Sequence, residues 1–377
     1  MNRAYRFRSS RQTVAAILLL AAIALAAVSV RAHAQSVATP RAAATRAAAI
    51  SHAKKVAAKK KVTAKKATTH AKTAKSSKKT TKPKKTTKPV KKIVSSTTDP
   101  LQTIGVSAAS TSSAGTIADP SGIPLPVGNL PGWRQVFTDN FQTSVPLGSF
   151  SGCVWTNTLS QSTCSGLPQA VSAKWWAYPD GTPDTAQNAT YEPSEVMSIH
   201  NGLLDFWLHT QNGAPVVATL VPKIPNDGDG TGETYGAYAI RFKASSLPGY
   251  KVSFLLWPDQ YTSGTWPSKG EIDFPEGDLN DHISAFMHWY GAMNGSQQDA
   301  FGGNVGLGSW HTAVIEWTPT AVKFILDGRV FGTSLSHIPS APMHWVLQVE
   351  TSTYGVVPTA SESGHVLVAW VAAYRPS

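Results

Sequence analysis

Cysteine is scarce in this chain, and one long segment lacks both acidic and aromatic residues. The two cysteines, Cys153 and Cys164, are too few for a structural zinc site without histidines at ligand spacing, so the sequence predicts no metal site. Residues 35–98 contain no Asp, Glu, Phe, Trp or Tyr and consist mainly of Ala, Lys and Thr. Because such a segment cannot bury enough apolar surface to offset the entropy lost on ordering, we expect residues 35–98 to be disordered.

The net charge of +12 combines two regions of opposite sign. Residues 1–98 hold 24 of the 34 Lys and Arg and none of the 22 Asp and Glu, so residues 99–377 carry 10 basic and 22 acidic side chains, a charge of −12. We therefore expect no specific nucleic-acid partner for the C-terminal region. The basic segment, with 17 lysines in residues 54–92, is expected to contact anionic polymers of the cell envelope.

The N-terminal residues have the pattern of a secretory signal. Arginines precede an uncharged stretch, Thr13–Val30, and Ala32-His33-Ala34 follows as an A-x-A cleavage site. We predict a signal peptide over residues 1–34 and a secreted, extracellular or cell-surface protein. A retained membrane anchor is the alternative, since the apolar stretch approaches the ~20 residues that span a bilayer.

The remaining residues divide into a linker and one domain. Residues 99–130 are rich in Ser, Thr, Pro and Gly and are predicted to be a linker. All 12 tryptophans lie at or after Trp133, so residues 131–377 are predicted to form a single domain with a full core, which we expect to be monomeric. In an exported chain Cys153 and Cys164 are expected to form a disulfide, and two free buried thiols are the alternative.

Short apolar runs separated by turn signals follow residue 130, without a long stretch of helical periodicity. The Asp327-Gly328 pair between two alternating runs predicts a β-hairpin. Many short strands of this kind predict an all-β sandwich. The expected strands are Glu195–Ile199, Leu203–Leu208, Tyr235–Lys243, Val252–Trp257, Glu271–Phe274, His282–Tyr290, Thr312–Trp317, Ala321–Leu326, His344–Glu350 and His365–Tyr374.

Three carboxylates lie within residues 271–276, which read EIDFPE. On a strand Glu271 and Asp273 share one face, whereas Glu276 points the other way unless a bulge inserts one residue. Proline within a sheet is largely confined to edges, strand starts and bulges, so Pro275 marks the irregularity. The sequence thus predicts three carboxylates on one face of a bulged strand. Two of them meet the need of a retaining glycosidase for a nucleophile and an acid/base, and the middle one can tune its neighbours.

This stretch resembles the E-x-D-x-x-E signature of glycoside hydrolase family 16, in the bulged form found in its laminarinase-like endo-β-glucanases. The resemblance continues on both sides and covers most of residues 131–377. The further segments that carry it are Thr234-Tyr235-Gly236 with Tyr238, Arg241 and Lys243; Phe254–Pro258; Trp266-Pro267 with Gly270; Met287-His288-Trp289; Trp310-His311 with Glu316–Pro319 and Asp327-Gly328; and Val366–Tyr374.

The resemblance implies a fold, a mechanism and a substrate class. The fold is a concanavalin-like jelly-roll sandwich with a concave sheet that forms an open cleft. In the implied mechanism Glu271 is the nucleophile, Asp273 tunes it and Glu276 is the general acid/base, with His288 in support. The implied substrates are β-1,3- or mixed β-1,3/1,4-glucans. No cofactor is expected, and a structural calcium ion is left open.

Sugar rings stack on aromatic side chains, and polar groups fix their hydroxyls. The candidates for these roles are Trp175, Trp176, Trp266 and Trp289, with Arg241 as the polar partner. Two places depart from the family pattern: Ala239 stands where the resemblance implies a sugar-contacting glutamate, and residues 348–350 read QVE. A transglycosylase, a hydrolase of galactan or xyloglucan, and a non-catalytic lectin-like domain therefore remain as alternatives.

Overall fold

The computed structural model describes residues 99–106, 119–156, 161–225, 232–259 and 266–377, which all belong to one compact unit. The predicted signal peptide and basic segment, residues 1–98, lie outside the described residues. Among the residues described, no helix is long and apolar enough to span a membrane.

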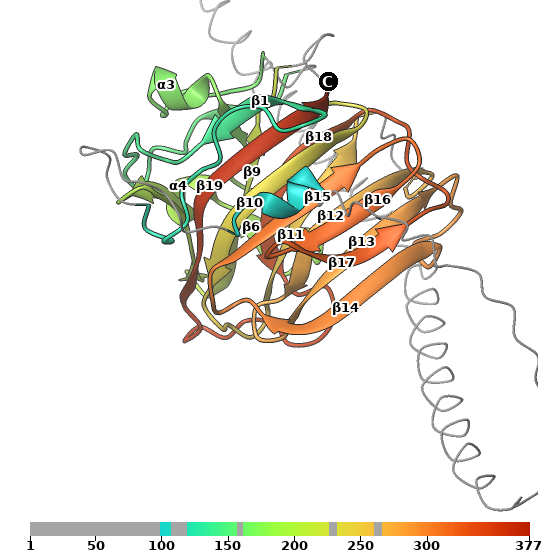
Figure 1. The fold of residues 1–377 in the computed structure, drawn as a ribbon. Helices are drawn as coiled ribbons and strands as arrows, with labels where there is room; N and C mark the ends of the chain where they lie inside the picture. The colour runs from blue at the N-terminus through green and yellow to red at the C-terminus, as the bar shows by residue number, and fades with distance from the viewer. Residues whose placement is uncertain (1–98, 107–118, 157–160, 226–231, 260–265) are drawn as a thin grey trace, which may run out of the picture. The chain divides into compact units, whose positions relative to one another are not determined.

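Two mainly antiparallel layers make up the fold, joined at one edge where β8 pairs with β9 (Figure 1). One, here called the β10 sheet, has the order β7 (Met197–His200), β8 (Leu203–Gln211), β19 (Gly364–Pro376), β10 (Gly236–Ala244), β15 (His311–Trp317), β16 (Val322–Leu326) and β17 (Arg329–Ser334), with β1 (Trp133–Asp139) also paired to β19. The other, the β12 sheet, has the order β14 (Gln298–Gly306), β13 (His282–Tyr290), β12 (Lys269–Asp278), β11 (Tyr250–Pro258), β18 (Met343–Thr351), β9 (Ala214–Pro222) and β4 (Trp175–Ala177).

Helices are short and few in the described part of the chain. The remaining elements are η1 (Pro100–Thr103), β2 (Cys153–Val154), β3 (Thr163–Cys164), α3 (Gln169–Ser172), β5 (Thr182–Pro183), β6 (Thr190–Tyr191) and α4 (Pro193–Val196). The β16–β17 hairpin turns at Asp327-Gly328 as predicted, with Leu326 paired to Arg329. The all-β jelly-roll sandwich expected from the sequence is confirmed.

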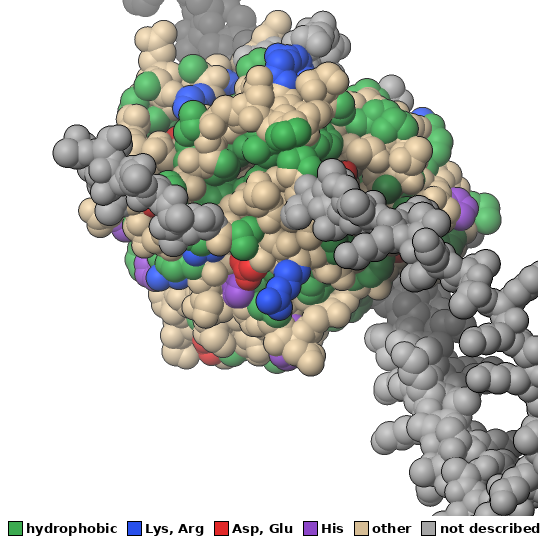
Figure 2. All heavy atoms as spheres, in the orientation of Figure 1, with side chains coloured by type: hydrophobic (Ala, Val, Ile, Leu, Met, Phe, Trp, Pro, Cys, Tyr) green, Lys and Arg blue, Asp and Glu red, His purple; other side chains and the backbone are tan. Residues whose placement is uncertain are grey.

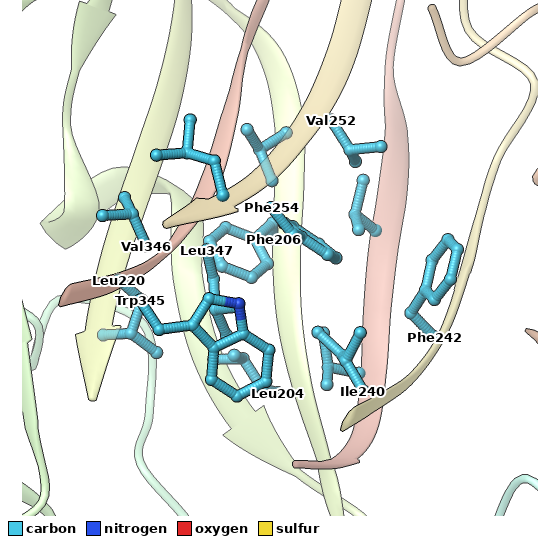
Figure 3. Packing of buried hydrophobic residues seen from close by; sticks show 14 of the residues in the cluster. Leu204, Phe206, Leu220, Ile240, Phe242, Val252, Phe254, Trp345, Val346 and Leu347 are labelled. Atoms are coloured by element: carbon cyan, nitrogen blue, oxygen red, sulfur yellow. The ribbon is translucent and has the colours of Figure 1, made fainter. Parts of the chain in front are cut away.

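The main core lies between the two sheets, where alternate side chains of facing strands meet. From the β10 sheet it takes Ile240 and Phe242, and from the β12 sheet Phe254 and Leu347, all at most 1% exposed. Figure 3 shows these side chains packed together with others of the same cluster. In β11, β12 and β13 alternate side chains therefore point into the core, and the others point away from it.

The predicted linker is wrong for residues 99–106 and 119–130, because they pack on the outer face of the β10 sheet. The Asp99 carboxylate caps η1 by accepting a hydrogen bond from the backbone N–H of Leu101 at 3.0 Å. Leu101 and Ile104 are 0% and 2% exposed and join a second apolar cluster that includes Trp370. The folded unit thus begins before residue 131.

In Figure 2, which shows the molecule in the orientation of Figure 1, charged side chains are few and scattered.

The short β2–β3 ribbon carries both cysteines. Cys153 and Cys164 face each other in its register and form a disulfide across a sequence separation of 11. By closing this loop in the unfolded chain, the bond favours the folded ribbon. Trp176, on neighbouring β4, donates a hydrogen bond from Nε1 to the carbonyl oxygen of Val154 at 3.0 Å and so connects the ribbon to the β12 sheet.

Candidate active site

Three carboxylates lie on the same face of β12. Asp273 pairs with Phe286 and Glu276 with Ser284, so three steps along β12 oppose two along β13. This shift is the β-bulge predicted at Pro275, and it returns Glu276 to the face that carries Glu271 and Asp273. The intervening apolar side chains point into the core instead. Alternation and one bulge therefore gather the carboxylates on the face away from the core.

Glu271 lies in a mostly buried position and is held by neighbouring donors. Its side chain is 10% exposed, and its Oε2 accepts a hydrogen bond from Nε1 of Trp266. Burial raises the pKa of Glu271 to about 7, while the hydrogen bonds from Trp266 and Asp273 oppose this rise. The charge of Glu276 adds to the rise. Near neutral pH Glu271 is thus balanced between its protonated and its nucleophilic, ionised form.

Asp273, two residues along β12, forms a side-chain hydrogen bond with Glu271. Burial, followed by the negative charges of Glu271 and Glu276, raises the pKa of Asp273 well above its usual range. A protonated Asp273 donates a hydrogen bond to Glu271, which stabilises the ionised nucleophile. The middle carboxyl group therefore works as a donor.

His288 lies opposite Glu271 on β13 and faces the same site. Its Nε2 is 4.0 Å from Oε2 of Glu271 and 3.8 Å from Oδ2 of Asp273. Burial lowers the pKa of His288 to about 4, so the imidazole is neutral at the pH where Glu271 titrates. The ring of Trp266 packs against that of His288, with centroids 5.0 Å apart. His288 and Trp266 thus border Glu271: the resemblance implied such a place for His288, whereas Trp266 was a candidate for stacking on a sugar.

The pKa of Glu271 predicts an acid limb in the pH profile of kcat/KM. Because only ionised Glu271 can attack, activity should fall as the pH drops through about 7. Replacing Trp266 with phenylalanine removes a hydrogen bond that lowers the pKa of Glu271, so the acid limb should move to higher pH. The profile of the wild type and of Trp266→Phe, measured from pH 4 to 10, checks this. An acid limb that stays in place in the variant would contradict the role of Trp266.

Two charged residues that sequence reasoning missed complete the site. Lys251 on β11 places Nζ 2.6 Å from Oε1 of Glu276 and 3.4 Å from Oε1 of Glu350 on β18. The lysine side chain is 12% exposed and that of Glu350 is 2% exposed. No local pattern marks Lys251, the second residue of β11, because its two carboxylate partners lie on two other strands.

Trp175 and Trp176 are not open stacking surfaces, which corrects two predicted sugar contacts. Trp175 is fully buried in the core and donates from Nε1 to Asp139 Oδ2 at 2.8 Å. Trp176 is 3% exposed, and the rings of Trp155 and Tyr178 lie 5.1 and 5.3 Å from its own. Of these rings, that of Trp155 is 53% exposed.

Trp289 and Arg241 are also placed away from the carboxylates. Trp289 follows His288 on β13, so it points to the opposite face, where its ring stacks on His337 at 4.6 Å. Arg241 is 6% exposed on the outer side of the β10 sheet, and its guanidinium donates to Ser121. Neither residue is placed to contact a sugar at the carboxylates, because Trp289 lies on the opposite face of β13 and Arg241 lies in the other sheet.

Ala239 lies on the same outer side of the β10 sheet as Arg241. It is fully buried in the apolar cluster beneath residues 99–106. Its departure from the family pattern therefore has no bearing on sugar recognition at β12. The departure at residues 348–350 lies next to the carboxylates of β12, because Glu350 forms an ion pair with Lys251, which also contacts Glu276.

One group of three potential metal ligands occurs in the described part of the chain. It consists of Glu271, Asp273 and His288, whose ligand atoms lie within 4.8 Å of one another. A cation held by this group would bind Glu271 and Asp273, two of the three carboxylates on β12. The structural calcium ion left open by the sequence remains untested.

Comparison with known proteins places this geometry in a family. Residues 184–372 match the model of glycosyl hydrolases family 16, a range that contains all three carboxylates. A beta-glucanase of Bacillus amyloliquefaciens is 27% identical over 108 residues, which cover 29% of this chain and 44% of that protein. The chain thus matches less than half the length of this curated relative.

A solved structure is similar in fold. The laminarinase from Rhodothermus marinus superposes with a TM-score of 0.50 at 22% identity, covering 64% of this chain and 97% of that one. The family match spans half of the chain and includes β12 with its bulge. The chain belongs to glycosyl hydrolases family 16.

Proposed function

We propose that this protein is a secreted, retaining endo-glycosidase that hydrolyses β-1,3- or mixed β-1,3/1,4-glucans. The observation that carries the proposal is the arrangement of Glu271, Asp273 and Glu276 on one face of bulged β12. A buried nucleophile, a protonated neighbour that donates to it and a second glutamate on the same face supply the groups that retaining hydrolysis requires.

Each carboxyl group has a defined part in the proposed double displacement, and Glu276 acts first as the acid and then as the base. In the first step a carboxylate oxygen of Glu271 bonds to the anomeric carbon as the glycosidic C–O bond breaks, and Glu276 gives its proton to the leaving oxygen. In the second step Glu276 takes a proton from water, whose oxygen attacks the anomeric carbon and releases Glu271 as a carboxylate. Asp273 keeps its proton throughout and stabilises ionised Glu271.

The substrate and the location are supported by independent observations. Two curated relatives, from Bacillus amyloliquefaciens and Bacillus subtilis (strain 168), are named beta-glucanases. The signal-like pattern of residues 1–34 and the disulfide between Cys153 and Cys164 favour an exported protein. Contact between the basic segment and anionic envelope polymers stays a prediction from its charge.

Reducing-sugar release from a panel of polysaccharides tests the proposal. We expect activity on laminarin, barley glucan or lichenan, and none on xyloglucan, agarose or carrageenan. Activity on a galactan alone would contradict the substrate class. Products longer than a defined oligosaccharide substrate would show that a sugar hydroxyl replaces water, which would make the enzyme a transglycosylase.

A further inference from the structure

Lys251 is nearly buried beside the proposed acid/base. β11 lies between β12 and β18, and Lys251 pairs with Glu350 across the β11–β18 register. The ammonium lies 2.6 Å from Oε1 of Glu276, 3.4 Å from Oε1 of Glu350 and 3.4 Å from Oγ1 of Thr353. These contacts leave Oε2 of Glu276 without a lysine partner.

The ammonium group determines which oxygen of Glu276 can carry the acidic proton. Lysine has three donors and no acceptor, so a proton on Oε1 would point at another donor. When Glu276 is protonated, its proton therefore belongs on Oε2, while Oε1 continues to accept from Lys251. The same contact fixes the rotation of the carboxyl group about its last side-chain bond.

Glu350 keeps Lys251 charged while Glu276 changes its protonation state. Burial alone would lower the pKa of Lys251, but the carboxylates of Glu276 and Glu350 more than reverse this and raise it. Glu350 is itself fixed, because its Oε2 accepts from Tyr191 Oη at 3.2 Å and from the Thr185 backbone N–H at 3.3 Å. A lysine paired with Glu276 alone would lose its counter-ion each time Glu276 became a neutral acid.

We propose that Lys251 is a positioning residue that holds the proton of Glu276 on Oε2, aimed at the leaving oxygen, and that Glu350 is the constant counter-ion of Lys251. The inference rests on the proposed function, because it assigns Glu276 the acid role. It adds a lysine and a third glutamate to that role without giving either of them contact with the substrate.

A comparison of leaving groups tests this inference. A laminarin hexasaccharide has a poor leaving group and needs the acid, whereas 2,4-dinitrophenyl β-laminaribioside leaves without a proton. Lys251→Met should lower kcat/KM for the hexasaccharide by about 10²-fold, the cost of a misplaced catalytic group. For the dinitrophenyl substrate the loss should stay within about threefold. Lys251→Arg, which still donates to both carboxylates, should recover most of the hexasaccharide activity.

Two further variants separate positioning from folding. Lys323 offers a matched control, since its Nζ lies 2.6 Å from Glu316 Oε2 and also contacts Asp99, outside the site. Lys323→Met should leave the ratio of the two kcat/KM values unchanged. The double variant Lys251→Met/Glu350→Gln removes the unpaired buried carboxylate and should keep the leaving-group pattern even if Lys251→Met folds poorly.

Each result of this comparison has a definite meaning. The positioning role would be overturned if Lys251→Met and the double variant lost equal activity on both substrates. It would also be overturned if they lost no activity on the hexasaccharide. In either case, activity of the wild type would leave the proposed function standing. A wild-type protein that cleaves neither substrate nor any polysaccharide of the panel would overturn the proposed function and the inference with it.

Discussion

Replacing Glu271 with glutamine is expected to lower kcat on a β-glucan by about 10⁴-fold or more, because an amide cannot form the ester to the anomeric carbon. Glutamine keeps the size of the side chain and an oxygen that can accept from Trp266 Nε1. The variant should therefore fold like the wild type, with an unchanged circular dichroism spectrum and thermal transition. Steady-state kinetics on the preferred glucan of the panel measures the loss.

A matched control shows that the effect belongs to the site. Glu195, in α4, is a glutamate away from β12 that accepts a hydrogen bond from Gln211 at 3.1 Å. Glu195→Gln should keep nearly all wild-type activity. If Glu271→Gln folded normally and turned over at a rate within tenfold of the wild type, Glu271 could not be the nucleophile.

Replacing Glu276 with glutamine should give a loss that depends on the leaving group. General acid catalysis contributes about 10²- to 10⁴-fold, so hydrolysis of a glucan should fall by that factor. Cleavage of the dinitrophenyl glycoside should persist in its first step, because this leaving group needs no proton. Release of the glycosyl-enzyme should then be slow, since Glu276 is also the base that activates water.

Added azide distinguishes this role from a structural one. Azide attacks the glycosyl-enzyme without a base, so it should restore turnover of the dinitrophenyl glycoside by Glu276→Gln and yield a β-glycosyl azide. Proton NMR of the product identifies the anomeric configuration. Failure of azide to raise the rate, with accumulation of the glycosyl-enzyme demonstrated, would argue against Glu276 as the base.

The carboxylates could be predicted because their signal is local. Two-residue alternation places Glu271 and Asp273 together, and Pro275 marks the bulge that brings Glu276 to the same face. These positions depend on one strand and its immediate backbone. The strands that pack around β12 change the environment of the three carboxylates. They do not change the fact that all three side chains point to the same face of β12.

Arg241 and Trp175 could not be placed in this way, because alternation divides a strand into two faces without saying which one lines the site. In a sandwich whose outer side is also covered, both faces of β10 are buried. The cover over Arg241 includes residues 119–130, whose Ser, Pro and Gly content is typical of a linker. Apolar side chains of that segment, such as Ile123 and Leu125, pack against the outer apolar cluster and hold it on the sheet.

Lys251 escaped prediction for a related reason. A lone lysine at the start of a strand normally extends its ammonium group into water. Here Glu276 on β12 and Glu350 on β18 meet at Lys251 only because both strands pair with β11, and β18 lies far from β11 in the chain. The ion pairs depend on this long-range register, which no local pattern in the sequence encodes.

Trapping the glycosyl-enzyme tests the central claim most directly. The protein is incubated with 2-deoxy-2-fluoro-β-laminaribiosyl fluoride, which forms the ester readily and releases it slowly, and the site of labelling is mapped by peptide mass spectrometry. The proposed mechanism predicts one label per chain, on Glu271, and no label in Glu271→Gln. A label on Glu276 or another residue, or cleavage with inverted configuration and no label, would contradict it.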